Sequence, residues 1–207
     1  MVIITYPTMI ENEASLINQM FDKGLPLLHV RKPKMNTEHL ITWINKIDTN
    51  YHSQIVIHIN NIVINNNLRD YKELLTVINN FNNQFIHLST DNYLYLLQYN
   101  SKLPKLSTSV HCITELNNLS TNYNRVFISP IFPSISKKGY SSNKNWKEEM
   151  TLRTNHTITT VALGGITPER IPTIKQMGFD DYALLGAIWE ATSPLKTFEL
   201  CQHFDQL

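Results

Sequence analysis

The sequence predicts an α/β fold, a single (β/α)8 TIM barrel that spans residues 1–207. Short apolar runs rich in valine and isoleucine alternate with longer stretches of helical periodicity, a pattern typical of βα units in a parallel sheet. Eight such units share 207 residues, about 26 residues each, which is near the lower limit for this barrel. An open, doubly wound sheet is the alternative that the same pattern allows.

The eight strand-like segments recur at near-regular intervals: Val2–Thr5, Leu27–Arg31, Ile55–Ile59, Phe85–Leu88, Leu106–Val110, Arg125–Ser129, Thr160–Leu163 and Asp181–Leu184. Helical periodicity predicts helices over Ala14–Phe21, Thr37–Ile47 (behind an Asn36 cap), Leu68–Ile78, Asn92–Tyr99, Ile113–Leu119 and Pro168–Met177 (with Thr167 as N-cap). Ser193-Pro194 opens a last helix. The longest stretch without periodicity, Pro130 to Asn145, follows the sixth strand, and we expect it to be an active-site loop.

The composition suits a soluble globular protein and argues against several classes of partner. Eighteen Lys and Arg balance seventeen Asp and Glu, so we expect neither a nucleic acid nor a membrane surface as partner. Cys112 and Cys201 are far apart without a CxxC pair, which fits a reducing cytosol. No signal-peptide pattern and no apolar run of about 20 residues is present, so we expect a cytoplasmic location.

Polar side chains recur at the ends of the second to fifth strands. Side chains alternate between the two faces of a strand, so His29 and Arg31 share one face and Leu28 and Val30 the other. In a barrel the first pair would point inward at the carboxyl end, where active sites lie. The next three strands end in the same way, at His58, His87 and His111. One such histidine is more often structural, but four with an arginine favour a polar pocket.

Glycines follow the last two strands. Gly164 and Gly165 join the seventh strand to a helix, and Gly186 follows the eighth strand. Glycines let backbone N–H groups approach an anion, and the loops after strands 7 and 8 are the usual phosphate site of phosphate-binding barrels. The alternative is that these glycines serve turn geometry only. Both loops together predict a phosphate site.

Three ordered motifs resemble those of the thiamine phosphate synthase/TenI family. They are His29-Val30-Arg31-Lys32, the loop Ser129-Pro130-Ile131-Phe132-Pro133-Ser134-Ile135-Ser136-Lys137, and Ala162-Leu163-Gly164-Gly165-Ile166. The resemblance implies a (β/α)8 barrel that binds a phosphorylated thiazole, with the phosphate on Gly164, Gly165 and Gly186. In the synthases a pyrimidine diphosphate also binds, held by a Gln-x-Arg-x-Lys motif, by Mg²⁺ and by the lysine of the strand-6 loop, here Lys137.

This chain departs from the synthase pattern at the diphosphate and metal positions. The Gln-x-Arg-x-Lys motif reads His29, Arg31 and Pro33, with Lys32 or Lys34 as the nearest substitutes for the lost lysine. The Asn-Asp pair of the synthases falls on His58 and Ile59, and an isoleucine offers Mg²⁺ no oxygen. The second Asp falls near Asn92, with Asp91 one position away. We therefore expect no metal cofactor, and Mg²⁺ only if the chain is a synthase.

The segment Ser109-Val110-His111 resembles the strand-5 motif of the thiazole tautomerases in the same family. There the histidine transfers protons, and the reaction makes a carboxylated dihydrothiazole phosphate aromatic without breaking a phosphate bond. The resemblance implies that His111 is the acid/base, a role that suits an imidazole and needs no metal. It implies substrate-binding roles for the remaining polar residues: His29, Arg31, His58, Ser134, Ser136 and Lys137. Alternatively, His111 is a hydrogen-bonded structural residue beside Cys112.

The leading hypothesis is therefore a thiazole tautomerase of thiamine (vitamin B1) biosynthesis, with the thiamine phosphate synthase as the close alternative. A non-catalytic protein that binds the thiazole phosphate is a further alternative. Four strand-end histidines could also ligate a metal in a hydrolase barrel. Against this, the first strand has no His-x-His motif, and strands 3 and 5 have no ligand acids. A homo-oligomer is left open.

Overall fold

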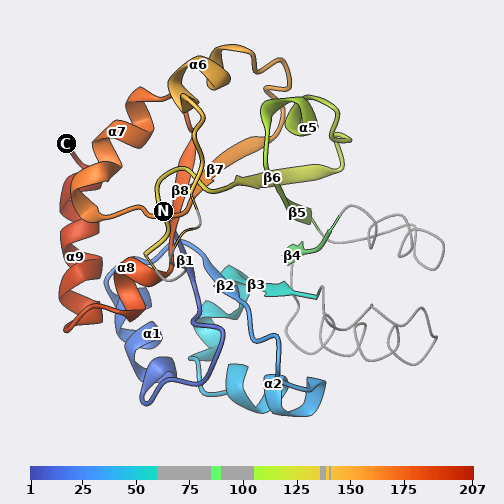
Figure 1. The fold of residues 1–207 in the computed structure, drawn as a ribbon. Coiled ribbons are helices and arrows are strands. Elements are labelled where there is room, and N and C mark those ends of the chain that lie inside the picture. Colours follow the sequence, from blue (N-terminus) through green and yellow to red (C-terminus); the bar gives the residue numbers. More distant parts are fainter. Residues whose placement is uncertain (60–84, 90–104, 136–138, 140) are drawn as a thin grey trace. The chain divides into compact units, whose positions relative to one another are not determined.

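The computed structural model describes residues 1–59, 85–89, 105–135, 139 and 141–207 (Figure 1). Eight parallel strands follow one another in chain order, β1 to β8, around a closed barrel. The predicted fold class, the (β/α)8 or TIM barrel, is confirmed. The predicted helices Leu68–Ile78 and Asn92–Tyr99 lie outside the described residues, as do Asp91, Ser136 and Lys137.

All eight predicted strands are present, with ends that differ by at most two residues. They are β1 (Val2–Ile4), β2 (Leu28–Val30), β3 (Ile55–His58), β4 (Phe85–His87), β5 (Lys105–Val110), β6 (Tyr123–Ile128), β7 (Thr159–Leu163) and β8 (Asp181–Leu184). All three residues of β1 and of β2 are buried, as expected for parallel strands covered on both faces. Strand β1 is accordingly all apolar, whereas β2 buries one polar residue, His29.

The described helices include two that the periodicity does not predict, α6 and α8. The α-helices are α1 (Glu13–Asp22), α2 (Thr37–Ile44), α5 (Ile113–Asn117), α6 (Trp146–Thr151), α7 (Ile171–Gln176), α8 (Gly186–Trp189) and α9 (Pro194–Asp205). Two 3₁₀ helices are η1 (Thr49–Gln54) and η2 (Pro168–Arg170).

The predicted cap of α2 is confirmed, and Thr167 takes the predicted N-cap position before Pro168 but makes no capping hydrogen bond. The Asn36 side chain accepts a hydrogen bond of 2.8 Å from the His39 N–H, which satisfies one exposed donor of the first turn. Thr167 precedes η2 without a capping bond, because its side chain interacts with Glu169 instead. That segment begins as a 3₁₀ turn and becomes α-helical only at α7.

The chain forms two compact units. The first unit comprises Met1–Ile4 and Ser109–Leu207, and the second comprises Thr5–Thr108. The boundary falls within β5. The prediction of a single domain over residues 1–207 stays a prediction. Within the described part of the chain, no helix is long and apolar enough to cross a membrane.

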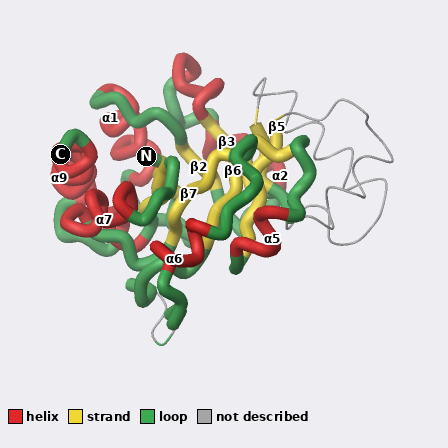
Figure 2. The backbone as a smooth tube through the Cα atoms, turned by 90° about the horizontal axis from the view of Figure 1, so that it is seen from above, coloured by secondary structure: helices red, strands yellow, loops and turns green. Residues whose placement is uncertain are grey.

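In the first unit, strand β7 pairs with β6 and β8, and β8 pairs with β1. Figure 2 shows β6 and β7 in yellow with the red helices α5, α6 and α7 around them. Helix α9 packs against α7 and α8, and its Cys201 side chain is fully buried. Burial, with Glu169 and Asp205 nearby, raises the pKa of the Cys201 thiol to about 12. Cys112, at the start of α5, is only half-buried.

In the second unit, a buried ion pair joins the segment after β2 to helix α1. The Lys32 ammonium donates to the Glu13 carboxylate at 2.5 Å and to the backbone oxygens of Tyr6 at 2.7 Å and Thr8 at 2.9 Å. It also lies 5.0 Å from the centre of the Trp43 ring. Burial lowers the pKa of Lys32 and raises that of Glu13. All these contacts hold Lys32 within the fold, so it does not replace the lysine of the synthase motif.

Candidate functional site

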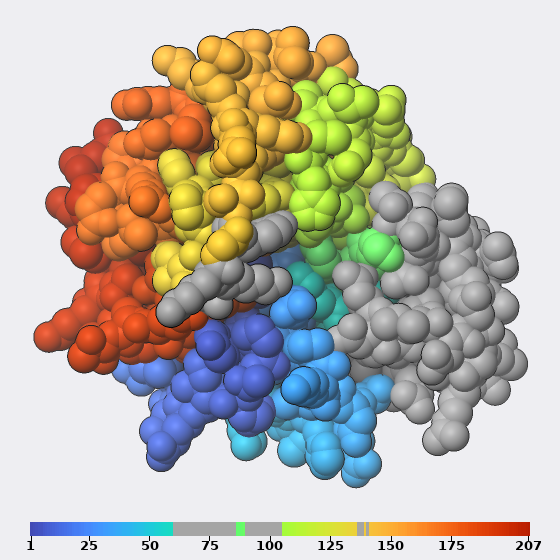
Figure 3. Space-filling view, in the orientation of Figure 1, coloured from blue at the N-terminus to red at the C-terminus, as the bar shows by residue number. Residues whose placement is uncertain are grey.

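The loop after β6 packs directly on the turn after β7 in the first unit. The Ile131 N–H donates to the Leu163 carbonyl, and the Phe132 N–H donates to the Gly164 carbonyl, both at 3.0 Å. The Trp146 indole, at the start of α6, donates to the Pro130 carbonyl at 3.1 Å. In the space-filling view the yellow atoms that follow β6 lie against the orange and red atoms of the later chain (Figure 3).

This packing gives a physical reason for the glycines after β7 and β8. Gly164 and Gly165 have φ angles of +105° and +63°, a region that L side chains rarely adopt. A Cβ at Gly165 would lie 2.2 Å from the Pro133 carbonyl oxygen, and one at Gly186 would lie 3.2 Å from the Ile135 Cβ. The glycines thus allow close approach of the β6 loop, whatever their role toward phosphate.

Substituting Gly165 with alanine should destabilise the chain more than the same change at Gly139. Both residues have positive φ angles, so both variants strain the backbone by about 1–2 kcal/mol. Only Gly165 faces a backbone oxygen, since nothing lies within 4 Å of a Cβ at Gly139. We expect Gly165→Ala to cost about 1–3 kcal/mol more than Gly139→Ala in urea unfolding. Equal costs would contradict the described packing of the β6 loop.

His111 lies directly after β5 and is exposed, with both its ring and its backbone held in place. Its Nδ1 lies 2.8 Å from the Ser129 carbonyl oxygen. Its N–H donates to the Glu115 carboxylate at 2.8 Å, and its carbonyl accepts from the Lys144 ammonium at 2.9 Å. The chain therefore fixes the orientation of a ring whose outer edge is open to solvent.

The remaining predicted residues of the β6 loop are only partly described. Ser134 is half-buried, and Ser136 and Lys137 lie outside the described residues. Lys144 is a residue that the sequence analysis missed: it contacts the His111 carbonyl and lies 5.3 Å from the centre of the Trp146 ring. The sequence could have indicated Lys144 only by its position, as a basic residue near the end of the predicted active-site loop.

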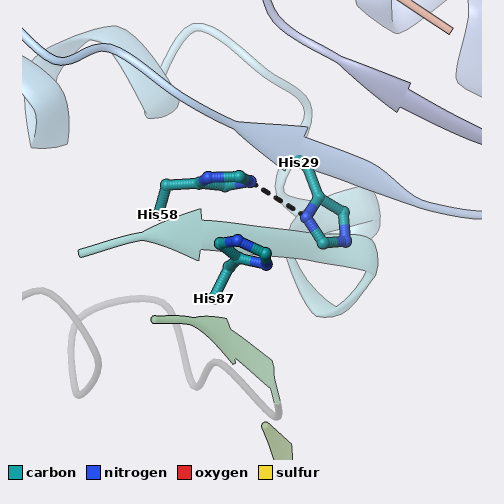
Figure 4. Close-up of side chains that lie close together, drawn as sticks. All are labelled: His29, His58 and His87. Carbon is teal, nitrogen blue, oxygen red and sulfur yellow. Dashed lines mark hydrogen bonds between the residues drawn. The ribbon is translucent and has the colours of Figure 1, made fainter. Parts of the chain in front are cut away.

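In the second unit, three of the four strand-end histidines lie together (Figure 4). His29 Nδ1 and His58 Nε2 are 3.1 Å apart. The His58 and His87 rings stack, with centroids 4.0 Å apart, and the His29 and His87 centroids are 5.8 Å apart. His29, His58 and His87 therefore lie on the same face of their strands, as the alternation of side chains predicts. His111 is described with the first unit.

The environment of this cluster favours uncharged rings. Burial lowers the pKa of His58 well below its usual value, and the neighbouring histidines and Arg31 lower it further. Burial and Arg31 also lower the pKa of His87 to about 3. His58 and His87 are therefore neutral at pH 7.

The described residues at the expected magnesium position do not fit Mg²⁺. His58 offers an imidazole nitrogen, whereas Mg²⁺ prefers carboxylate and water oxygens in octahedral geometry. Ile59 is fully buried and has no donor atom. Asp91, the nearest acid to the second metal position, lies outside the described residues.

Comparisons with known proteins test the family resemblance. A family profile described as thiamine monophosphate synthase matches residues 1–188, whereas a search of curated proteins finds no match. The thiamine phosphate pyrophosphorylase structure from Bacteroides thetaiotaomicron is 24% identical with a TM-score of 0.75, covering 100% of this chain and 97% of that chain. The Pyrococcus furiosus thiamine phosphate pyrophosphorylase is 13% identical, with a TM-score of 0.70, covering 99% and 94%.

A further structure shows that the fold itself is widely shared. The 3-hexulose-6-phosphate synthase of Salmonella typhimurium is 9% identical, with a TM-score of 0.68, and the match covers 99% of this chain and 98% of that chain. At such identities the structures show the fold alone. The family profile, by contrast, matches nearly the whole sequence. The chain belongs to the thiamine monophosphate synthase/TenI family of thiamine-biosynthesis enzymes.

Proposed function

We propose that this chain is a thiazole tautomerase, which isomerises a carboxylated dihydrothiazole phosphate to its aromatic form. The observation that carries the proposal is the 2.8 Å contact between His111 Nδ1 and the Ser129 carbonyl oxygen. A carbonyl oxygen only accepts hydrogen bonds, so Nδ1 carries the hydrogen and Nε2 keeps its lone pair. The protein thus presents one defined basic nitrogen at an exposed position.

The proposed reaction needs one group that takes up a proton and returns it. Nε2 of His111 removes a proton from one carbon of the dihydrothiazole, and the imidazolium gives it back at another position of the conjugated system. The Ser129 carbonyl stabilises the transient positive charge on the ring, because its dipole already faces Nδ1–H. Contacts of the His111 backbone with Glu115 and Lys144 hold the ring in one orientation.

The binding roles of the other residues are part of the proposal. The family binds thiazole phosphates, and we assign the phosphate to backbone N–H groups around Gly164, Gly165 and Gly186. Ser134, Ser136 and Lys137 are proposed to hold the substrate in the same unit. In the second unit, His29, Arg31 and His58 are proposed substrate ligands, with Arg31 suited to an anionic group.

The second candidate is the thiamine phosphate synthase reaction, which the names of the two pyrophosphorylase structures favour. It would join hydroxymethylpyrimidine diphosphate to the thiazole phosphate, and it releases diphosphate. Oxygen ligands for Mg²⁺ would have to replace His58 and Ile59, because the leaving diphosphate needs charge stabilisation. The donor set at those two positions supports the tautomerase instead.

One assay separates the two reactions. The purified full chain is incubated with each substrate set, with and without Mg²⁺, and both products are measured. We expect aromatic thiazole phosphate to form at a rate that added Mg²⁺ leaves unchanged. Formation of thiamine phosphate at about 1 per second or faster, only in the presence of Mg²⁺, would make the chain a synthase. Binding of the thiazole phosphate without any product would make it a non-catalytic member.

A further inference from the structure

Three imidazoles converge from neighbouring strands in the second unit (Figure 4). His29 belongs to β2, and His58 and His87 are the last residues of β3 and β4. The strands are directly paired: His29 lies opposite Val56, and His58 lies opposite His87. One ring nitrogen from each histidine lies within 4.8 Å of the other two. The sheet itself fixes this spacing, because all three side chains come from strands.

We propose that His29, His58 and His87 form a binding site for one divalent transition-metal ion, with Zn²⁺ as the first candidate. Three histidines that leave a fourth position open are a known zinc ligand set. Zn–N bonds of about 2.0–2.1 Å in a tetrahedron place the nitrogens about 3.3 Å apart. His29 Nδ1 and His58 Nε2 are already 3.1 Å apart. A His87 ring nitrogen lies within 4.8 Å of both, so the three rings have to draw closer together when an ion binds.

A hydrogen-bond chain behind His87 directs one nitrogen toward the ion. The Ser107 hydroxyl donates its only hydrogen to the Ile86 carbonyl at 3.3 Å. Its oxygen therefore accepts from His87 Nδ1, which lies 3.0 Å away. With the hydrogen on Nδ1, Nε2 is the His87 nitrogen that has the lone pair a metal ion needs. Metal-bound histidines typically donate their other N–H in this way.

The charges around the cluster determine which ions and which fourth ligand it takes. A histidine binds a metal ion through the lone pair of its neutral imidazole. His29 Nδ1 and His58 Nε2 share one hydrogen, which has to leave when both nitrogens bind the ion. It moves to the second nitrogen of the same ring, which faces away from the ion. Three neutral ligands leave both charges of the ion uncompensated, and Arg31 adds a further positive charge nearby. The open position should therefore take an anionic oxygen, either hydroxide or a carboxylate or phosphate group.

This site shares the His58 position with the magnesium site of the synthases but differs from it in its donor atoms, and it does not rest on the proposed isomerisation. Imidazole nitrogens select Zn²⁺, Co²⁺, Ni²⁺ or Cu²⁺ over Mg²⁺. From the sequence alone, metal-ligating histidines were an alternative only for a hydrolase barrel, and no metal cofactor was expected. The spacing of the three histidines on β2, β3 and β4 supports metal binding by itself, without any comparison to hydrolase barrels.

Metal binding can be tested on the full chain after removal of metals with a chelator. Equilibrium dialysis against Zn²⁺ should show one ion per chain. The cobalt form should have the strong visible absorption of a tetrahedral site, and X-ray absorption of the zinc form should count three imidazoles at about 2.0–2.1 Å. Absence of a bound ion, or a six-coordinate shell rich in oxygen, would overturn the proposal.

Variants then assign the ligands. His58→Asn removes one ligand and should weaken Zn²⁺ binding by more than about 100-fold, whereas Ser107→Ala keeps all three and should weaken it by about 10- to 100-fold. His156→Asn removes an exposed histidine of the first unit and should leave binding unchanged. Unchanged affinity in His58→Asn would overturn the proposal. If circular dichroism shows that this variant does not fold, the ligand count of the unsubstituted chain decides.

Discussion

Replacing His111 with asparagine should lower the rate of thiazole isomerisation by about 100- to 10,000-fold. Asparagine keeps a side chain of similar reach but cannot take up a proton near neutral pH. The loss should fall on kcat, with KM for the thiazole phosphate nearly unchanged, because the proposed phosphate ligands are glycine N–H groups. Steady-state kinetics on the purified variant measure both constants.

The matched control is His156→Asn, which removes another exposed histidine of the same unit. It should keep the full isomerisation rate, and both variants should show the same circular dichroism spectrum as the original chain. A structural role for His111 would instead lower stability and raise KM. A loss smaller than about 10-fold, in a variant that folds, would show that another group moves the proton.

Replacing Lys32 with methionine should destabilise the chain by about 3–5 kcal/mol, because it leaves the Glu13 carboxylate buried without its partner. The side chains of Lys32 and Glu13 are 1% and 0% exposed, so water cannot solvate the remaining charge. The same substitution removes the hydrogen bonds to the Tyr6 and Thr8 carbonyls. Urea unfolding, compared at a constant m-value, measures the loss.

Two further variants test whether the buried charge is the cause. Lys34→Met alters an exposed lysine two residues away, and its effect should stay within about 0.5 kcal/mol. The double variant Glu13→Leu with Lys32→Met removes both charges and should recover part of the loss. A cost below about 1 kcal/mol for Lys32→Met alone would be typical of an exposed pair and would contradict the described burial.

The strands could be predicted from the sequence because each is a short apolar run between polar segments. Helices α6 and α8 could not, because they have six and four residues, too few for a helical period to repeat. Helix α6 buries only Trp146 and Met150, four residues apart. In such short helices the hydrogen bonds and packing of the folded chain decide the conformation, and the local pattern does not.

The alternation of side chains predicted part of the candidate site. It brought His29, His58 and His87 to one face. It did not predict that Lys32, which lies beyond the end of β2, is buried. Its partner Glu13 lies 19 residues away at the start of helix α1, so the sequence could not reveal the ion pair. Nor could it show that the β6 loop fills the space beside Gly165, since that contact joins residues far apart in the chain.

The contrast between the two cysteines allows a fluorescent reporter to be attached without any substitution. Cys201 is fully buried and its raised pKa keeps the thiol protonated, so alkylating reagents at neutral pH should react with it very slowly. Cys112 is half-buried and directly follows His111 in the chain. A maleimide dye should therefore label Cys112 selectively. Its emission should then report the arrival of phosphorylated ligands beside His111, the proposed acid/base, in real time.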